Sequence, residues 1–78
     1  MFVSVHHSRY QALQGELVAL RKTAGLSQVQ LAERLGVGQS YISKIERGEA
    51  YVDVLVFVGW CQACGVEAGR TLDQLFTA

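Results

Sequence analysis

Two cysteines at helical spacing are the first residues whose types could do chemistry. Cys61 and Cys64 form a CxxC pair, which can act as a redox couple or supply half of a zinc site. Here the pair lies inside a segment whose pattern predicts a helix, with no strand before it and no second CxxC in the chain. The cysteines share a helical face with Phe57 and Trp60, where small apolar side chains pack. We therefore predict two free, buried structural thiols.

Other residue types that serve catalysis or metal binding occur without a supporting motif. The adjacent pair His6 and His7 could ligate a metal, but histidines near a chain terminus are more often simply solvated. Ser, His and Asp all occur, yet no nucleophile motif surrounds any of them. We therefore expect no enzymatic activity, no metal and no cofactor.

The segment GQSYISKIERG, residues 38–48, gathers a different kind of chemistry. At about 100° per residue, Tyr41, Ile42 and Ile45 fall on one side of a helix over residues 39–47. The other side carries short hydrogen-bonding groups and two cations, from Gln39, Ser40, Ser43, Lys44 and Arg47. On an isolated amphipathic helix, this would be an ordinary solvated face.

The element before this segment favours a binding face over a solvated one. Ser27 and Gln30 form a capping-box pattern that begins a helix, and Gly36 ends it. Its apolar positions are Val29, Leu31, Ala32 and Leu35. Two short helices joined by a tight glycine-containing turn form a helix-turn-helix, whose second helix here has the polar outer face.

Three further helices complete an all-α chain. The first begins at Ser8, in a capping box with Gln11, and ends at Gly25. The fourth covers residues 53–64 with Asp53 as its N-cap, and a short fifth begins near Thr71, in a capping box with Gln74. Residues 1–7 lack helical periodicity and are predicted to form a short extended arm, so that residues 8–78 form the domain. The apolar stripe of the first helix is Leu13, Leu17, Leu20 and Ala24; that of the fifth is Leu72, Leu75 and Phe76.

Composition limits the chain to one small domain with a local positive potential. The sequence has 78 residues, half of them apolar, and a formal net charge of zero. Residues 1–52 carry six basic and four acidic side chains, whereas residues 53–78 carry one basic and three acidic ones. A local positive patch can meet a few phosphates. No signal peptide and no apolar run of about 20 residues is visible, so we expect a cytoplasmic protein without a membrane partner.

The stretch LSQVQLAERLGVGQSYISKIERGE, residues 26–49, closely resembles the phage repressor/Cro-like family of helix-turn-helix regulators, often called Xre-like. The resemblance extends upstream through LVALRKTAG and downstream through CQACGV, so it covers about residues 9–76. It implies a compact five-helix, lambda-repressor-like domain that binds double-stranded DNA sequence-specifically. The expected function is transcriptional regulation, by repression, as a homodimer on a near-palindromic operator. The matching positions are Gln28, Leu31, Ala32, Gly36, Val37, Ser40, Ile42, Ser43, Ile45, Glu46 and Gly48.

The resemblance also assigns roles to individual residues. The recognition helix would be the third, with base-facing positions at Gln39, Ser40, Ser43 and Lys44. Phosphate-contacting positions would be Ser27, Gln28 and Arg47. Arg21 and Glu46 match a structural ion pair that ties the first helix to the end of the third. Two departures are Gly38, where a Ser or Thr cap would be usual, and GVEAGRTLDQL, which is longer than the usual link to the last helix.

The fourth helix is apolar nearly all round, which predicts burial on both sides. Its second apolar face, opposite the core, carries Leu55, Val56, Gly59 and Ala63. We expect this face to meet its symmetry mate in a two-fold homodimer, helped by Leu72, Leu75 or Phe76. The alternative is that the fifth segment folds back over it.

Several biological settings use a module of this kind. The chain could be a restriction–modification controller protein or the antitoxin of a toxin–antitoxin pair, and a toxin or an anti-repressor would then be a protein partner. Because the net charge is zero, the module could also bind a protein in place of DNA.

Overall fold

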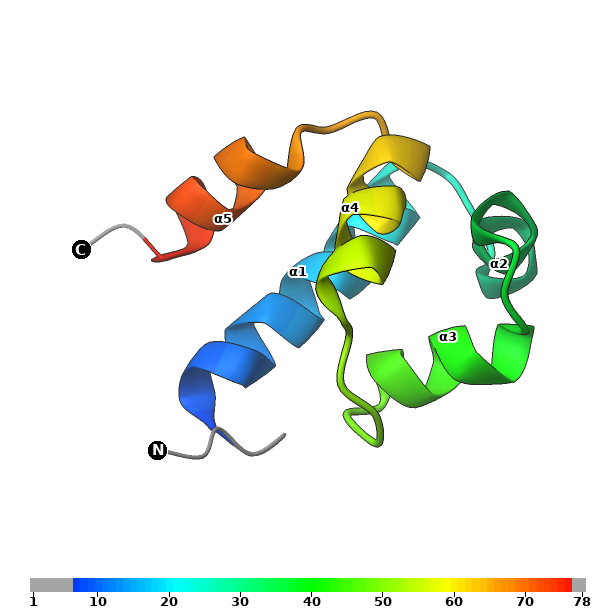
Figure 1. Cartoon of the computed structure of the whole chain (residues 1–78), viewed down its shortest axis with the longest axis horizontal. Helices are drawn as coiled ribbons and strands as arrows, with labels where there is room; N and C mark the ends of the chain where they lie inside the picture. The colour runs from blue at the N-terminus through cyan, green and yellow to red at the C-terminus, as the bar shows by residue number, and fades with distance from the viewer. Residues whose placement is uncertain (1–6, 77–78) are drawn as a thin grey trace.

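The computed structural model describes residues 7–76, and these residues form five α-helices and no strand (Figure 1). In Figure 1, α1 and α4 cross near the centre, α2 and α3 lie to one side of them, and α5 lies to the other. The predicted all-α, five-helix fold is therefore confirmed. The helices are α1 (Ser8–Thr23), α2 (Gln28–Leu35), α3 (Gln39–Glu46), α4 (Val54–Ala63) and α5 (Ala68–Phe76).

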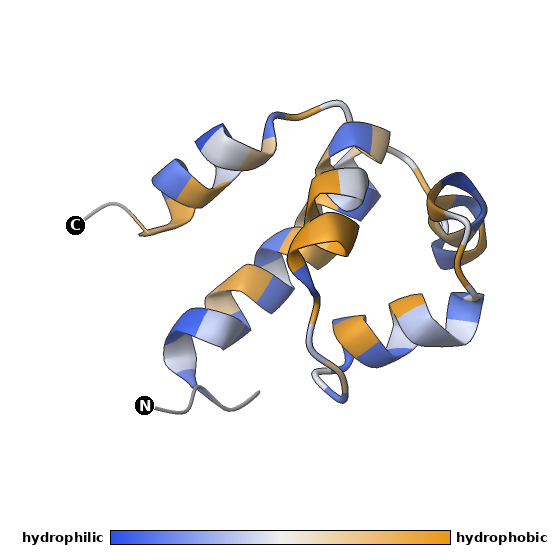
Figure 2. Cartoon of the chain, in the orientation of Figure 1, coloured by the Kyte–Doolittle hydropathy of each residue, from blue (hydrophilic) through white to orange (hydrophobic). Residues whose placement is uncertain are grey.

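One hydrophobic core holds the first four helices together. Trp60 of α4 is its largest fully buried side chain, and the Trp60 indole Nε1 donates a hydrogen bond to the Leu17 carbonyl of α1 at 3.0 Å. This bond satisfies a polar group that would otherwise be costly to bury. Figure 2 shows that α4 is hydrophobic along most of its ribbon, whereas α1 is mixed. The buried core cluster is Leu17, Leu26, Leu31, Ala32, Ile42, Ile45, Phe57, Trp60 and Cys61.

Local capping chemistry sets the ends of α2 and α4 as predicted. Ser27 Oγ accepts a hydrogen bond from the backbone amide of Gln30 at 3.0 Å. In return, the side-chain Oε1 of Gln30 accepts from the backbone amide of Ser27 at 2.9 Å. Gly36 ends α2 in the left-handed conformation, with φ of 69°, which glycine adopts more readily than residues that have a Cβ. At α4, Asp53 accepts from the Val56 amide at 2.9 Å. Each cap satisfies backbone groups that have no partner within their own helix.

The predicted cap of α1 is wrong by one residue. His7, not Ser8, is the N-cap: its backbone is extended and its Nδ1 accepts from the Arg9 amide at 3.1 Å. Ser8 is already helical, so its hydroxyl is no longer placed to cap the first turn. The expected arm, with His6, lies outside the described residues except for His7.

The predicted start of α5 is also wrong. The helix begins at Ala68, so Thr71 lies inside it, and the Thr71 hydroxyl donates to the Glu67 carbonyl at 2.8 Å. Thr71 is buried, whereas Leu72, expected on the buried side, is 38% exposed. Because α5 begins at Ala68 and not near Thr71, the link between α4 and α5 is short. The link looked long in the sequence because the first turn of α5 was counted as part of it.

Two expected core positions face solvent. Val29 in α2 is 52% exposed, and Ala24, the C-cap of α1, is also exposed. The buried face of α2 is defined by Leu31 and Ala32, and Val29 projects away from it.

The second apolar face of α4 is largely covered by α2 of the same chain. A Cβ added at Gly59 would stand 2.9 Å from Leu35 Cδ2, so the close approach that Gly59 permits is made to α2 and not to a partner. Val56 and Ala63 are partly buried against the core. The expectation that Gly59 lets a partner backbone come close is therefore corrected, and Val56 and Ala63 pack at least in part within their own chain. Leu55 is 83% exposed and remains on the surface.

Ser27, which caps its helix, and Ser8, which does not, give a matched test of these helix starts. Ser27→Ala should lower the free energy of unfolding by about 0.5–2 kcal/mol, because it removes the hydroxyl that accepts from the Gln30 backbone amide. Ser8→Ala should stay within about 0.5 kcal/mol of wild type, because His7 provides the cap. Denaturant unfolding measures both variants, and an equal loss for Ser8→Ala would contradict the assignment of His7.

Candidate nucleic-acid interface

The outer face of α3 presents the residues that sequence reasoning selected for base contact. Gln39, Ser40 and Lys44 are exposed and Ser43 is half-buried. Ile42 and Ile45 are fully buried on the opposite face and anchor the helix to the core. Gly38 is the N-cap of α3 and provides no side-chain cap, as expected from its type. The polar face is therefore carried by a helix whose other side is fixed.

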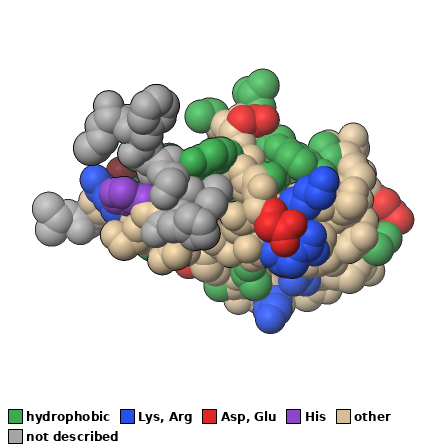
Figure 3. Space-filling view, turned by 90° about the horizontal axis from the view of Figure 1, so that it is seen from below, with side chains coloured by type: hydrophobic (Ala, Val, Ile, Leu, Met, Phe, Trp, Pro, Cys, Tyr) green, Lys and Arg blue, Asp and Glu red, His purple; other side chains and the backbone are tan. Residues whose placement is uncertain are grey.

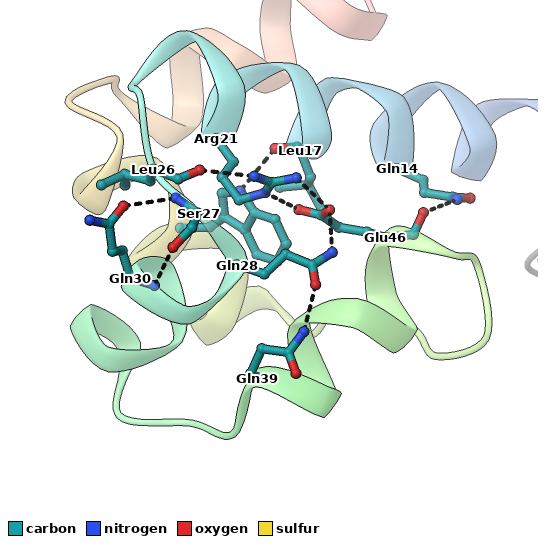
Figure 4. A network of polar contacts seen from close by, with 10 residues as sticks. Gln14, Leu17, Arg21, Leu26, Ser27, Gln28, Gln30, Gln39 and Glu46 are labelled. Atoms are coloured by element: carbon teal, nitrogen blue, oxygen red, sulfur yellow. Dashed lines mark hydrogen bonds and ion pairs between the residues drawn. The ribbon is translucent and has the colours of Figure 1, made fainter.

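A largely buried ion pair fixes the C-terminal end of α3. Arg21 Nε lies 2.6 Å from Glu46 Oε2 and Arg21 Nη2 lies 2.9 Å from Glu46 Oε1, a bidentate pair (Figure 4). The two side chains are only 12% and 6% exposed. Arg21 Nη1 also donates to the Leu26 carbonyl at 2.8 Å. The predicted structural pair is present, and it joins α1 to α3 and to the turn before α2.

Two glutamines extend this pair to the surface. Gln28 Nε2 donates to Glu46 Oε1 at 2.9 Å, and Gln39 Nε2 donates to Gln28 Oε1 at 2.7 Å (Figure 4). A continuous chain of hydrogen bonds thus runs from the largely buried guanidinium of Arg21 to the exposed amide of Gln39. The sequence indicated Gln28 as a phosphate contact but did not reveal that it also supports Gln39.

Two further side chains of α1 hold the backbone at the end of α3 and in the loop that follows it. Gln14 Nε2 donates to the Glu46 carbonyl at 2.7 Å, so it satisfies a carbonyl in the last turn of α3. Tyr10 donates to the Ala50 carbonyl at 3.0 Å and accepts from the Val52 amide at 2.9 Å. Sequence reasoning missed both residues, because nothing local marks a contact more than thirty residues away.

The expected phosphate contacts lie at both ends of the polar face. Ser27 and Gln28 stand at the N-terminus of α2, where free amides and the helix dipole favour an anion. At the other end, Arg47 Nε lies 2.6 Å from Glu49 Oε2, and both side chains are about half exposed. Arg47 Nη1 also donates to Ser43 Oγ. Figure 3, seen from below α3, shows basic side chains around an acidic group on this face.

The two cysteines are free, as predicted, and Cys61 is buried while Cys64 is half-buried. Burial raises the pKa of both thiols, so both are protonated near neutral pH and neither has the thiolate character of a reactive cysteine. Within residues 7–76, no three His, Cys, Asp or Glu side chains come together as metal ligands. No helix in that range is long and apolar enough to cross a membrane.

Comparison with known proteins gives the same fold at substantial identity. A helix-turn-helix family model matches residues 17–70. An XRE-family-like protein from Pseudomonas syringae pv. tomato str. DC3000 is 41% identical, with a TM-score of 0.84, over 91% of this chain and 87% of that one. The clp gene regulator ClgR from Corynebacterium glutamicum is 30% identical, with a TM-score of 0.74, over 82% of this chain and 68% of that one. No curated protein matches.

The five-helix fold, with α2 and α3 as the helix-turn-helix, defines a DNA-binding class of domain. Within that class, the chain belongs to the XRE family of helix-turn-helix proteins, because the family match covers more than half of its length and the Pseudomonas structure aligns over nearly all of it. Membership of this family indicates a DNA-binding protein of transcriptional regulation. Members of the family are generally not enzymes.

The Arg21–Glu46 pair gives a stability test with a built-in control. Glu46→Met should destabilise the fold by about 3 kcal/mol or more, because it leaves the Arg21 charge buried without its partner. The double variant Arg21→Met/Glu46→Met should recover much of that loss, since neither charge remains buried. Denaturant unfolding of both variants checks this, and a loss below about 1 kcal/mol for Glu46→Met would show that water screens the pair.

Proposed function

We propose that this chain is a sequence-specific regulator that inserts α3 into the major groove of double-stranded DNA and represses transcription from a near-palindromic operator. The observation that carries the proposal is the supported polar face of α3. The exposed amide of Gln39 is held through Gln28 by the largely buried Arg21–Glu46 pair. A side chain already held in place loses less conformational freedom on binding, which favours a specific contact.

The side chains on this face suit direct base readout. Gln39 uses one N–H on Gln28 and keeps its Oε1 and second N–H, the pair that recognises adenine N6 and N7. Lys44 is exposed and suits guanine O6 and N7, while Ser40 and Ser43 can meet several bases. Backbone contacts at Ser27, Gln28 and Arg47 would then set the register of the helix on the duplex.

Repression follows most directly from binding alone. A protein seated on an operator can exclude other proteins from the same DNA, whereas activation needs an additional contact with the transcription machinery. Restriction–modification control and antitoxin function are settings in which the same DNA-binding step would operate. They differ in the genes controlled and in the protein partner.

A second candidate function is binding of a protein partner in place of DNA, and the zero net charge is the observation that favours it. The two candidates differ in their response to salt. Each phosphate contact releases counterions, so DNA binding must weaken steeply as salt rises. Binding to a protein through the apolar and neutral polar surface would respond much less.

We further propose a homodimer that uses the exposed start of α4. Val54 and Leu55 are 76% and 83% exposed, although burial of large apolar side chains is strongly favourable. Compared with the face expected from the sequence, Val54 joins Leu55 as a proposed contact. Val56, Gly59 and Ala63 instead pack within the chain. Leu72 is also exposed, and Leu75 and Phe76 are half-buried. Two-fold symmetry would present two copies of α3 to two half-sites about 34 Å apart.

Base readout is tested by Gln39→Ala against Arg47→Ala. Gln39→Ala should cost about 1–3 kcal/mol on an operator selected from a random DNA pool, and should relax the preference at one position per half-site. Arg47→Ala should weaken binding to all sequences by similar factors, because a phosphate contact carries no base information. Equal losses for Gln39→Ala on operator and random DNA would reject its role in base readout.

Dimerisation is tested by Leu55→Glu, with Ala19→Glu on the exposed side of α1 as the matched control. Leu55→Glu should give a folded monomer with much weaker operator binding, because a buried unpaired carboxylate would oppose the interface. Sedimentation equilibrium and circular dichroism measure assembly and folding. Ala19→Glu should keep the dimer, and a wild type that stays monomeric at high micromolar concentration would overturn this part of the proposal.

A further inference from the structure

The carboxylate of Glu49 lies at the C-terminal end of the recognition helix. Gly48 ends α3 in the left-handed conformation, with φ of 76°, and turns the chain back over the last helical turn. The Glu49 amide then donates to the Lys44 carbonyl at 2.8 Å. This turn places an acidic residue beside two basic residues of the proposed DNA-binding face, Lys44 and Arg47.

Glu49 holds the Arg47 guanidinium in a two-point contact. Arg47 Nε donates to Glu49 Oε2 at 2.6 Å, and Arg47 Nη2 donates to Glu49 Oε1 at 3.3 Å. The third guanidinium nitrogen, Nη1, donates to Ser43 Oγ. All three nitrogens of Arg47 therefore have a partner within the chain. The hydrogen bond and charge of Arg47, and then the charge of Lys44, hold the pKa of Glu49 below its usual range, so the carboxylate is ionised at neutral pH.

A carboxylate bound in this way makes the same contacts as a phosphate. The guanidinium fork binds either group through two parallel N–H···O bonds. The Arg47 and Glu49 side chains are 52% and 55% exposed, so an incoming phosphate can reach the pair from solvent. An ion pair this exposed is weak and readily exchanged. By contrast, the Arg21–Glu46 pair is nearly buried and is closed to such exchange.

We infer that Glu49 is an internal competitor of the DNA backbone for Arg47: its carboxylate occupies the guanidinium in the free protein, and a phosphate displaces it on binding. This inference rests on the proposed function. Because a phosphate contact is independent of base sequence, Glu49 would lower affinity for all DNA by a similar factor and leave sequence preference unchanged. It is a residue that sets affinity, not specificity.

The experiment is a double-mutant cycle of Glu49→Gln and Arg47→Ala, with Glu33→Gln as the control for charge. Glu33 is exposed on α2 and makes no ion pair with the described residues, so Glu33→Gln changes the net charge equally without releasing Arg47. Affinity is measured over a range of salt on random-sequence duplex DNA and on a selected operator. Circular dichroism and thermal unfolding confirm that each variant is folded.

Glu49→Gln should bind both DNAs about two- to five-fold more tightly than wild type, the factor expected for releasing one exposed ion pair. Its salt dependence should steepen by up to about one unit of log–log slope. In the Arg47→Ala background, the effect of Glu49→Gln should fall to that of Glu33→Gln.

Two results overturn the inference while leaving the proposed function intact. The first is a Glu49→Gln effect no larger than that of Glu33→Gln, and the second is a Glu49→Gln effect that persists undiminished without Arg47. Either would show a general charge effect. A wild type that binds no DNA at low salt would overturn the proposed function and this inference together.

Discussion

The bidentate contact between Arg21 and Glu46 is the constraint on which the rest of the proposed DNA interface depends. The helix that carries the polar face has only eight residues, too few to be stable alone in water. Its apolar anchors, Ile42 and Ile45, are fully buried and fix it to the core. The ion pair adds a directional constraint, because a displacement of α3 that separated the pair would leave two nearly buried charges without partners. Its contribution is to orientation more than to net stability, since desolvation offsets much of the attraction.

The two ends of α3 in the proposed interface differ in how firmly their polar side chains are held. At the N-terminal end of α3, Gln39 bonds to Gln28, which in turn bonds to Glu46, so the position of the Gln39 side chain is set by the ion pair. At the C-terminal end, Arg47 is held by an exposed carboxylate that water and phosphate can reach. A well-held amide suits base recognition, where small displacements break two hydrogen bonds at once. An exchangeable cation suits the backbone, whose phosphates accept contacts over a wider range of positions.

Local signals predicted most of the fold, and tertiary packing accounts for the errors. Ser27 and Asp53 cap their helices through hydrogen bonds to residues three positions away, so both caps could be predicted from the local sequence. Ser8 and Thr71 show the same pattern but cap nothing, because each helix starts earlier. Gly59 was assigned to a partner because a helical wheel shows which residues share a face, but not which neighbour covers it; here that neighbour is α2. In the proposed interface, the family resemblance indicated the residue positions. The contacts made by Gln14, Gln28 and Glu49 depend on the tertiary structure and have no local signal in the sequence.

The zero net charge of the domain links the two parts of the proposed function, DNA binding and dimerisation. Glu46 and Glu49 each offset an arginine near α3, which reduces the net positive charge close to the proposed DNA-binding face. A single domain would therefore gain little of the sequence-independent affinity on which most DNA-binding proteins rely. Joining two domains makes the second binding step intramolecular and raises affinity without adding charge. The exposed apolar start of α4, at Val54 and Leu55, is the surface through which such joining would compensate for the weak electrostatics.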